Sequence, residues 1–407
     1  MKHTLLILFA ACYGILFSQT TPTPPPVPNS WVKKNDFTGL KRERAVAFTI
    51  NGVGYIGTGV DTAEIVRKDL WRYDDITDSW TQMANLPGSE RRNAVGFAIG
   101  NYGYITTGIN TANATDVGAT KLSDNWRYDP ASNSWTAMAP FPGNNGQGMY
   151  FGACFVIDNE AFVVAGKHGP NNYTSNMYMY DPAQDLWYLG PSFPGGVRYQ
   201  LSALAVDGKG YVGLGTDQDL YRRDWWEYKR STNTWAQRAD LPASARASAV
   251  TFTIADRGFV CMGTNGGMLD DLWEYNPFDN SWSVRAPYGG SPRKNAVAFV
   301  LGSRAYVGTG KGVSGKKQSI HEYHPMWTLG LEESEMEVSV YPNPTSDVIQ
   351  ISSEFQPEKV TLINMLGEQV RSASNTKTLS VRDLPSGTYQ LIVQNGTKVA
   401  NTTVTIL

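Results

Sequence analysis

Cysteine, histidine and charged residues are scarce in this 407-residue chain. It has three cysteines and four histidines, and 18% of its residues are charged. The formal net charge is −2 and the lysines and arginines are dispersed, so the basic surface expected of a nucleic-acid-binding protein is missing. The 12 Trp, 21 Tyr and 40 Gly instead favour strands and tight turns. We expect an all-β protein with no nucleic-acid partner.

Long apolar runs are confined to the first residues. Lys2 and His3 precede an apolar run from Leu5 to Phe17, which is too short to span a bilayer. A proline-rich stretch follows. This order predicts a signal peptide at residues 1–19 and a proline-rich spacer at residues 20–30. No later segment is apolar enough to cross a membrane, so we expect no transmembrane segment in the mature chain.

A repeat of about 50 residues runs through the middle of the chain. Its first marker is a tryptophan, found at Trp31, Trp80, Trp135, Trp187, Trp235 and Trp282. Its second marker is an arginine that stands 13 residues before an aromatic residue, which stands four residues before a glycine. The arginines are Arg42, Arg91, Arg198, Arg246 and Arg293, and one copy has Met149 in this place. The register indicates six copies.

Each copy contains four short β-patterned segments. In the second copy, a hairpin within residues 93–107 is followed by two further strands, the last of which carries Trp135. Four-stranded units at this period predict a six-bladed β-propeller at residues 31–327, because twisted sheets stacked radially leave only short edges. The sixth copy lacks an outer tryptophan, so the N-terminal strand around Trp31 is expected to close the ring.

Three short motifs recur within the copies. One is W-x-x-M-A-x-L-P-x-x-x-R-x-x-A-V at Trp80 to Val95, and another is D-L-W-x-Y-[DN] at Asp69 to Asp74 and Asp271 to Asn276. Second strands end on YVGTG or FVVAG. These motifs resemble kelch repeats of the galactose oxidase-like superfamily, although the usual double glycine is reduced to one firm glycine per copy. The resemblance implies a kelch-type propeller.

A second β pattern follows an acidic linker expected at residues 328–336. Alternating apolar and polar residues predict a small immunoglobulin-like β-sandwich at residues 337–407. The motifs are Tyr341-Pro-Asn-Pro, Asn364-Met-Leu-Gly and Leu384-Pro-Ser-Gly-Thr-Tyr. They resemble the type A C-terminal sorting domain of the type IX secretion system. The resemblance implies that the type IX machinery is a partner and that the protein is secreted or attached to the outer cell surface.

The arginines of the repeat are the first candidates for ligand binding. They are expected at the inner rim of the face where the second-to-third-strand loops and the inter-blade loops emerge. A ring of Arg42, Arg91, Arg198, Arg246 and Arg293 could bind a carboxylate, a sulfate or an acidic sugar. The alternative is that each arginine hydrogen-bonds loop carbonyls of its neighbouring blade.

Irregular loops provide a second candidate. The loop from Gly108 to Trp126 is longer than its counterparts, and so is the next inter-blade loop, which ends at Met149. These loops predict a recognition patch formed by Asn110 to Asp124, Pro142 to Met149 and Lys167 to Tyr173, with His168 and Tyr173 as ligand-binding residues. Loop drift without function is the alternative, because surface insertions cost little.

These features predict a secreted or cell-surface module that binds a glycan or a protein. The alternative is a carbohydrate-active enzyme, because the chain resembles six-bladed kelch proteins that interconvert sialic acid anomers with acid and base side chains beside arginines. The candidate acids are Glu43, Glu90, Asp217 and Asp219.

A copper carbohydrate oxidase is less favoured. The resemblance to galactose oxidase would require two histidines, a tyrosine and a cysteine-linked tyrosine around copper. After the signal peptide, the chain offers only His168, His321 and His324, in separated positions. Cys154 and Cys261 fall in different blades, too far apart for a disulfide. We therefore expect free thiols, no metal and no cofactor.

Overall fold

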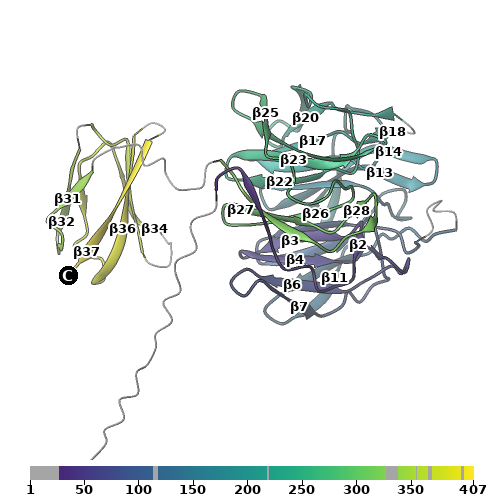
Figure 1. Ribbon diagram of the computed structural model, residues 1–407, viewed down its shortest axis with the longest axis horizontal. Helices are drawn as coiled ribbons and strands as arrows, with labels where there is room; N and C mark the ends of the chain where they lie inside the picture. The colour runs from purple at the N-terminus through teal and green to yellow at the C-terminus, as the bar shows by residue number, and fades with distance from the viewer. Residues whose placement is uncertain are drawn as a thin grey trace, which may run out of the picture.

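Six four-stranded antiparallel sheets make up the larger part of the structure (Figure 1). The computed structural model describes residues 27–112, 118–217, 220–326, 338–353, 355–364, 369–395 and 398–407. These residues form strands and no helix, which confirms the all-β prediction. They therefore include no helix long and apolar enough to cross a membrane. The predicted signal peptide, Trp327 and the predicted linker lie outside the described residues.

The sheets are numbered here in the order of their first strands. Sheet one contains β3 (Val46–Ile50), β4 (Val53–Gly57), β6 (Leu70–Asp74) and β7 (Ser79–Met83). Sheet two contains β8 (Val95–Ile99), β9 (Tyr102–Thr106), β10 (Asn125–Asp129) and β11 (Ser134–Met138). Sheet three contains β12 (Ala153–Ile157), β13 (Glu160–Gly169), β14 (Asn172–Asp181) and β15 (Leu186–Leu189).

The remaining sheets follow the same plan. Sheet four contains β16 (Ser202–Val206), β17 (Lys209–Gly213), β20 (Trp225–Lys229) and β21 (Thr234–Arg238). Sheet five contains β22 (Val250–Ile254), β23 (Arg257–Thr264), β24 (Met268–Asn276) and β25 (Ser281–Arg285). Sheet six contains β26 (Val297–Leu301), β27 (Arg304–Gly308), β30 (Ile320–His324) and the N-terminal β1 (Ser30–Lys33).

The first strand of each sheet alternates buried and half-buried residues, as a strand with two different faces must. In sheet one, Phe48 points into the core and stacks on Tyr55 of β4, with ring centroids 5.7 Å apart. The alternate residues Ala47 and Thr49 line a cavity bordered by four other first strands. Large aromatic residues therefore fill the spaces between sheets, and small residues line a central channel.

The first strands touch one another in cyclic order. Contacts join β3 to β8, β8 to β12, β12 to β16, β16 to β22, β22 to β26, and β26 back to β3. Three short ladders add to the loops at the end where the chain enters these strands. They are β2 (Arg42–Glu43) with β5 (Val60–Asp61), β18 (Thr216–Asp217) with β19 (Leu220–Tyr221), and β28 (Lys311–Gly312) with β29 (Gly315–Lys316). This end is called the loop face below.

The N-terminal strand joins the end of the repeat region. β1 pairs with β30 from Ser30 opposite His324 to Lys33 opposite His321. Just before β1, the Asn29 side-chain oxygen accepts hydrogen bonds from the Tyr323 hydroxyl at 3.0 Å and from a backbone N–H at 2.9 Å. Asn133 accepts the same pair of bonds in sheet two. Asn29 thus takes over in sheet six the role of a residue that the other sheets carry internally.

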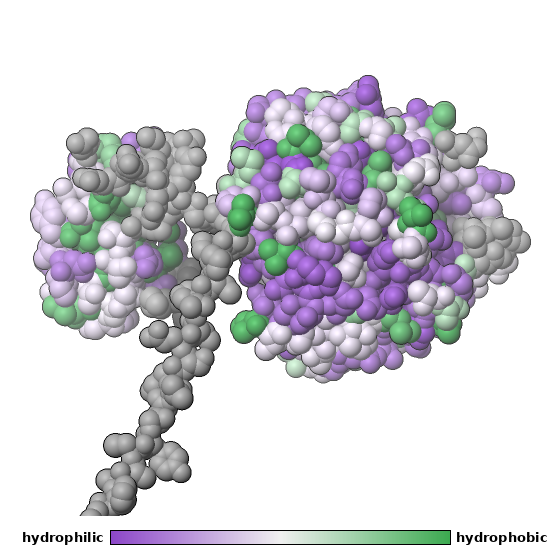
Figure 2. All heavy atoms as spheres, in the orientation of Figure 1, coloured by the Kyte–Doolittle hydropathy of each residue, from purple (hydrophilic) through white to green (hydrophobic). Residues whose placement is uncertain are grey.

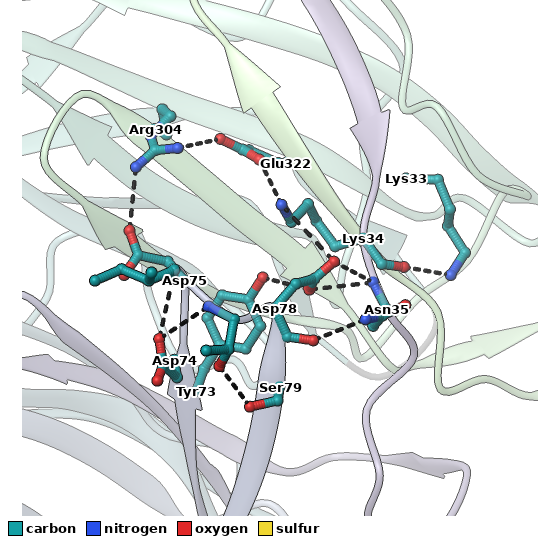
Figure 3. Close-up of polar contacts among 12 residues, drawn as sticks. Lys33, Lys34, Asn35, Tyr73, Asp74, Asp75, Asp78, Ser79, Arg304 and Glu322 are labelled. Carbon is teal, nitrogen blue, oxygen red and sulfur yellow. Dashed lines mark hydrogen bonds and ion pairs between the residues drawn. The ribbon is translucent and has the colours of Figure 1, made fainter. Parts of the chain in front are cut away.

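A polar network adds to the contact between sheets six and one (Figure 3). Arg304 lies between Glu322 at 2.9 Å and Asp75 at 3.2 Å, and so connects the two sheets. Lys34, just after β1, lies 3.5 Å from Glu322 and 3.8 Å from Asp78. Glu322 is buried, so its two basic neighbours offset the cost of removing its charge from water.

The C-terminal strands form two further sheets. A three-stranded sheet contains β31 (Ser339–Tyr341), β32 (Val348–Ser352) and β35 (Thr378–Ser380). A four-stranded sheet contains β33 (Lys359–Ile363), β34 (Gln369–Ser374), β36 (Gly387–Asn395) and β37 (Lys398–Ile406). Side chains from both sheets, such as Ile349 and Leu391, share one buried core.

Candidate functional site

Six residues form a ring of backbone hydrogen bonds on the loop face. Each backbone N–H donates to the carbonyl oxygen of the preceding member, over N–O distances of 3.0 to 3.3 Å, and the first member donates to the last. All six have left-handed backbone conformations, with φ between 50° and 61°, which cost free energy for residues with a side chain. The ring consists of Arg44, Asn93, Phe151, Gln200, Ser248 and Asn295.

The ring surrounds a cavity of about 130 Å³, called the central pit here. The pit is lined by the six ring residues and by the residue that follows each of them. Below it, the first strands enclose a further cavity of about 200 Å³ lined mainly by small side chains, including Cys154. Both cavities are bordered by the residues that follow the ring residues, such as Ala45 and Ala94, so the concave pit continues towards the space between the first strands.

One side of the pit is charged. A Glu43 carboxylate oxygen accepts a hydrogen bond from the Asn295 side-chain amide at 2.7 Å and lies 3.6 Å from Nε of Arg44. The Arg44 guanidinium extends towards the Phe151 ring, whose centroid is 5.3 Å from the guanidinium carbon. A carboxylate and a cation therefore meet at the edge of the pit, with an aromatic ring beyond them.

An aromatic cluster lies beside the pit and reaches it through Phe151. Phe151 lies 5.6 Å from Tyr150 and 5.7 Å from Tyr199 between ring centroids. Tyr199 stacks on Tyr173 at 5.2 Å with a 10° angle between ring planes. The buried Lys167 ammonium lies 4.8 to 5.6 Å from the centroids of the three tyrosine rings. Cation–π contacts with one ammonium therefore stabilise this arrangement of the tyrosine rings.

The predicted arginine ring is buried, not exposed at the rim. All five arginines are at most 3% exposed. Arg91 shows the common arrangement: its two terminal nitrogens donate to Asp124 at 2.8 and 2.6 Å, and one of them also donates to the Thr107 carbonyl at 3.0 Å. The same bidentate pairs join Arg42 to Asp69, Arg198 to Asp224 and Arg246 to Asp271. Their donors are engaged inside the protein.

Burial alone would raise the pKa of Asp69 and of Asp271, but the paired arginines outweigh it and hold both pKa values below the usual range. The carbonyl partners also differ from the sequence-based alternative. Arg91 donates to a carbonyl of its own sheet, not of the neighbouring one. The arginines therefore fasten the second-to-third-strand loop to the start of the same sheet.

The structure brings the three segments of the predicted patch together. The backbone N–H of Met149 donates to the Leu122 carbonyl at 3.4 Å, and His168 Nδ1 lies 2.9 Å from the carbonyl oxygen of Gly148. His168 is buried, whereas Tyr173 stacks on Tyr199 beside the pit and does not line it. Residues 113–117 of the first segment lie outside the described residues. Among the described residues, none of the three segments lines the pit.

The candidate acids are dispersed. Glu43 is at the pit, Asp217 forms an ion pair with Arg222, and Glu90 lines a separate cavity of about 410 Å³. Asp219 lies outside the described residues. Of the three acids that the structure describes, only Glu43 contacts residues that line the pit, Arg44 and Asn295.

The histidines and cysteines also lie apart. His321 contacts the Tyr288 hydroxyl at 3.0 Å, and His324 lies 3.3 Å from Glu322. Cys154 and Cys261 are free. Burial raises the pKa of the Cys154 thiol to about 12. Across the described part of the chain, no three His, Cys, Asp or Glu residues are grouped as metal ligands would be.

The ring residues were missed by the sequence analysis, although the repeat register contains a signal for them. Each ring residue stands two positions after the repeat arginine, or after Met149 in sheet three. Because these positions differ in residue type from copy to copy, they break the pattern that identifies the fold. Positions that vary between copies, two residues after the repeated arginine, were therefore the signal for the ring.

The comparisons with known proteins agree with this architecture. Residues 98–310 match the family model described as "KLHDC2/KLHL20/DRC7 Kelch-repeats domain". Kelch-like protein 35 of Mus musculus is 27% identical over 33% of this chain and 22% of its own length. Kelch-like protein 25 of Xenopus tropicalis is 27% identical over 29% of this chain and 19% of its own length. The chain thus spans about a fifth of these relatives.

A solved structure described as "Structure of YjhT" superposes on this chain with a TM-score of 0.59. The match covers 78% of this chain and 99% of the other, at 15% sequence identity. This likeness concerns the fold. Residues 339–407 match the model described as "Secretion system C-terminal sorting domain". A sorting domain of this type indicates export by the type IX machinery, to the outside of the cell or to its surface.

Proposed function

The chain belongs to the kelch-repeat family, and on that premise we propose that its six sheets are the blades of a closed six-bladed propeller at residues 31–327. The cyclic contacts of the first strands and the hydrogen-bond ring support closure. The pairing of β1 with β30 supports the N-terminal strand as the clasp. The linker at residues 328–336 then leads to an immunoglobulin-like sandwich at residues 337–407, which acts as the sorting domain.

We propose that the exported propeller is a glycan-binding module and that the central pit is its binding site. The observation that carries this proposal is the mixed lining of the pit. Phe151 supplies an aromatic face to the pit, and Arg44, Gln200 and Asn295 supply polar groups around it. A sugar ring has both apolar C–H faces and hydroxyl groups, so it fits a site that combines aromatic faces with planar hydrogen-bonding groups.

A small ligand fits this site better than a protein surface does. The pit is concave, and its volume is about 130 Å³. On the side of the molecule drawn in Figure 2, apolar residues are scattered among polar ones. Protein interfaces are usually organised around a clustered apolar centre, and the pit itself offers mixed polar and aromatic chemistry. A protein ligand is the other outcome of the test below.

The experiment is a glycan-array screen with the mature propeller, followed by calorimetric titration of each hit. Phe151→Ala should weaken binding at least tenfold, because it removes the aromatic face and its contact with Arg44. The matched control is Phe278→Ala, since Phe278 is 66% exposed on the turn between β24 and β25 and away from the loop face. Its affinity should equal that of the wild type.

Equal affinity of the Phe151 variant and the wild type would reject the pit as the glycan site. An array without hits, combined with a specific protein recovered by pull-down that depends on Phe151, would replace the glycan by a protein ligand. A circular dichroism spectrum identical to that of the wild type is required of both variants before these outcomes are read.

A sugar-converting enzyme is the second candidate, on the single observation that Glu43 lies beside Arg44 at the pit. A carboxylate next to a cation is a common arrangement for proton transfer at a sugar carbon. Among the described residues, one arginine forms an ion pair with Glu43, and the carboxylate is buried, which favours binding over turnover. Glu43→Gln separates the two roles: a binder keeps its affinity, whereas an enzyme keeps binding and loses turnover of the array hits.

A further inference from the structure

Four sheets contain the same buried triad. In sheet five, Arg246 donates through both terminal nitrogens to Asp271, and the Trp273 indole N–H donates to the same carboxylate at 2.8 Å. Sheets one, two and four repeat it with Asp69 and Trp71, Asp124 and Trp126, and Asp224 and Trp226. In each case, one internal carboxylate balances one buried guanidinium.

Sheet six keeps the arginine and lacks the carboxylate. Arg293 is 1% exposed, yet Ser319 and His321 stand where the other sheets have aspartate and tryptophan. Among the described residues, no carboxylate oxygen lies within 4 Å of the Arg293 guanidinium, although the other four arginines each have one. Burial lowers the pKa of Arg293, because its charged form is removed from water, and Asp36, a carboxylate farther from the guanidinium, opposes this shift only in part.

The hydrogen bonds of Arg293 leave the carboxylate-binding edge open. Nε donates to the Ser291 carbonyl at 2.9 Å, one terminal nitrogen to the Thr309 carbonyl at 3.0 Å, and the other to the Ser291 hydroxyl at 3.2 Å. A guanidinium has five N–H groups, so two remain. In the other sheets, the two terminal nitrogens hold both oxygens of the aspartate.

The position of the missing carboxylate can be reached from solvent. The aspartates that fill it in the other sheets keep 16 to 34% of their side chains exposed. The side chain of Ser319 ends at its hydroxyl oxygen, where aspartate has its carboxyl carbon, so both carboxylate oxygens are missing, and Ser319 is itself half-buried. The Tyr288 ring, 4.9 Å from the guanidinium, forms one wall of this position. Its size and charge suit a compact, singly charged acceptor.

We propose that Arg293, Ser319 and Tyr288 form a binding site for a small monovalent anion, either chloride or the carboxylate of a small acid. The bound anion supplies the charge that aspartate supplies in the four other sheets. Tyr288 also contacts Trp31 of β1 at 5.0 Å, so occupancy strengthens sheet six where the N-terminal strand joins it.

The test is thermal unfolding of the full chain in sodium chloride, sodium formate or sodium methanesulfonate at equal ionic strength. Methanesulfonate is too bulky for the place of a carboxylate. Chloride, formate or both should raise Tm by about 2 °C or more over methanesulfonate, since a ligand that binds only the native state stabilises it. The two arms distinguish an inorganic ion from a carboxylate, and equal Tm values in all three salts would refute the site.

Ser319→Asp is the decisive variant, because it rebuilds the internal pair of the other sheets. Its Tm should no longer depend on the anion, and in methanesulfonate it should exceed that of the wild type. The matched control is Asp271→Ser, which creates the sheet-six arrangement in sheet five and should lower Tm in methanesulfonate more than in the responsive salt. Anion dependence that persists unchanged in Ser319→Asp would overturn the proposal.

A direct measurement does not depend on stability. Chloride NMR linewidth reports exchange of the ion with a protein site. Excess broadening should appear with the wild type, fall on adding formate if both anions share the site, and vanish in Arg293→Met, which imitates Met149 of sheet three. Broadening of equal size in Arg293→Met would place the ion elsewhere and exclude Arg293 as its ligand.

Discussion

The buried pair of Arg246 and Asp271 permits a quantitative test of how the repeat is stabilised. Arg246 is fully buried, and its terminal nitrogens lie 2.5 and 2.6 Å from the two oxygens of Asp271. Asp271→Asn keeps the shape and removes the charge, which leaves a guanidinium in the interior without a counterion. Sheet three shows the alternative solution, because it has Met149 in the arginine position and Asn176 in the aspartate position.

Breaking a buried pair by removing one partner costs about 3–5 kcal/mol. The Asp271 side chain is 31% exposed, so water recovers part of this loss, and we expect about 2–3 kcal/mol for Asp271→Asn. Arg246→Met together with Asp271→Asn removes both charges and should cost no more than about 1 kcal/mol. The second substitution should thus restore about 2 kcal/mol, which is a coupling far beyond that of distant sites.

Urea unfolding of the wild type, both single variants and the double variant gives these free energies, provided that the m-values agree. The C-terminal core is common to all four proteins and serves as an internal reference if it unfolds separately. Additive costs, with the double variant less stable than either single variant, would refute the reasoning that the charge, and not the packing, makes the pair indispensable.

The pair also predicts a pH dependence with a definite sign. Although burial alone would raise it, the pKa of Asp271 is held below its usual value by Arg246. The unfolded chain therefore binds the proton more readily than the native protein. The contribution of the pair should be complete above about pH 4 and should be lost as the pH falls through the lower native pKa. Stability differences between the wild type and the double variant should shrink in the same acidic range.

Two further predictions concern sheet six. Burial, with a smaller contribution from Arg293, lowers the pKa of His321 to about 4, so stability should fall between about pH 6.5 and pH 4, where the unfolded imidazole is protonated and the native one is not. His321→Gln should flatten this slope in urea titrations. Asn29→Ala removes the acceptor of two hydrogen bonds, so it should lower the free energy of unfolding by about 1–2 kcal/mol and speed amide hydrogen exchange in β30. Asn29→Asp should cost less, because aspartate keeps the acceptor, as Asp78 does in sheet one.

The fold was predictable because its determinants repeat. Trp135 and its counterparts, the aromatic second strands and the glycines recur in register, and they fill the spaces between sheets in every copy. Each copy therefore supports the assignment of the next. Even the pairing of the N-terminal strand with the last copy could be anticipated, since Trp31 has the same spacing from Arg42 as Trp80 has from Arg91.

The candidate site was harder to predict because its chemistry depends on burial and direction. A regular series of arginines looks the same in sequence whether the side chains point into a channel or back into their own sheets. Asp124 holds the Arg91 side chain inside its own sheet, but it lies 33 residues away in the sequence. In the other sheets, the interval between the arginine and its aspartate varies with loop length. Only coordinates show that this carboxylate closes the pair.

Departures from the repeat therefore separate into two kinds. A departure that replaces a whole interacting set, as Met149, Asn176 and Tyr178 do in sheet three, leaves no unbalanced charge and needs no ligand. One that replaces part of a set, as in sheet six, leaves a cost that something outside the chain can offset. The ring positions belong to neither kind, since their bonds use only the backbone. Substitutions of their side chains therefore leave the backbone ring intact. These positions can change to suit a ligand with the least effect on the fold.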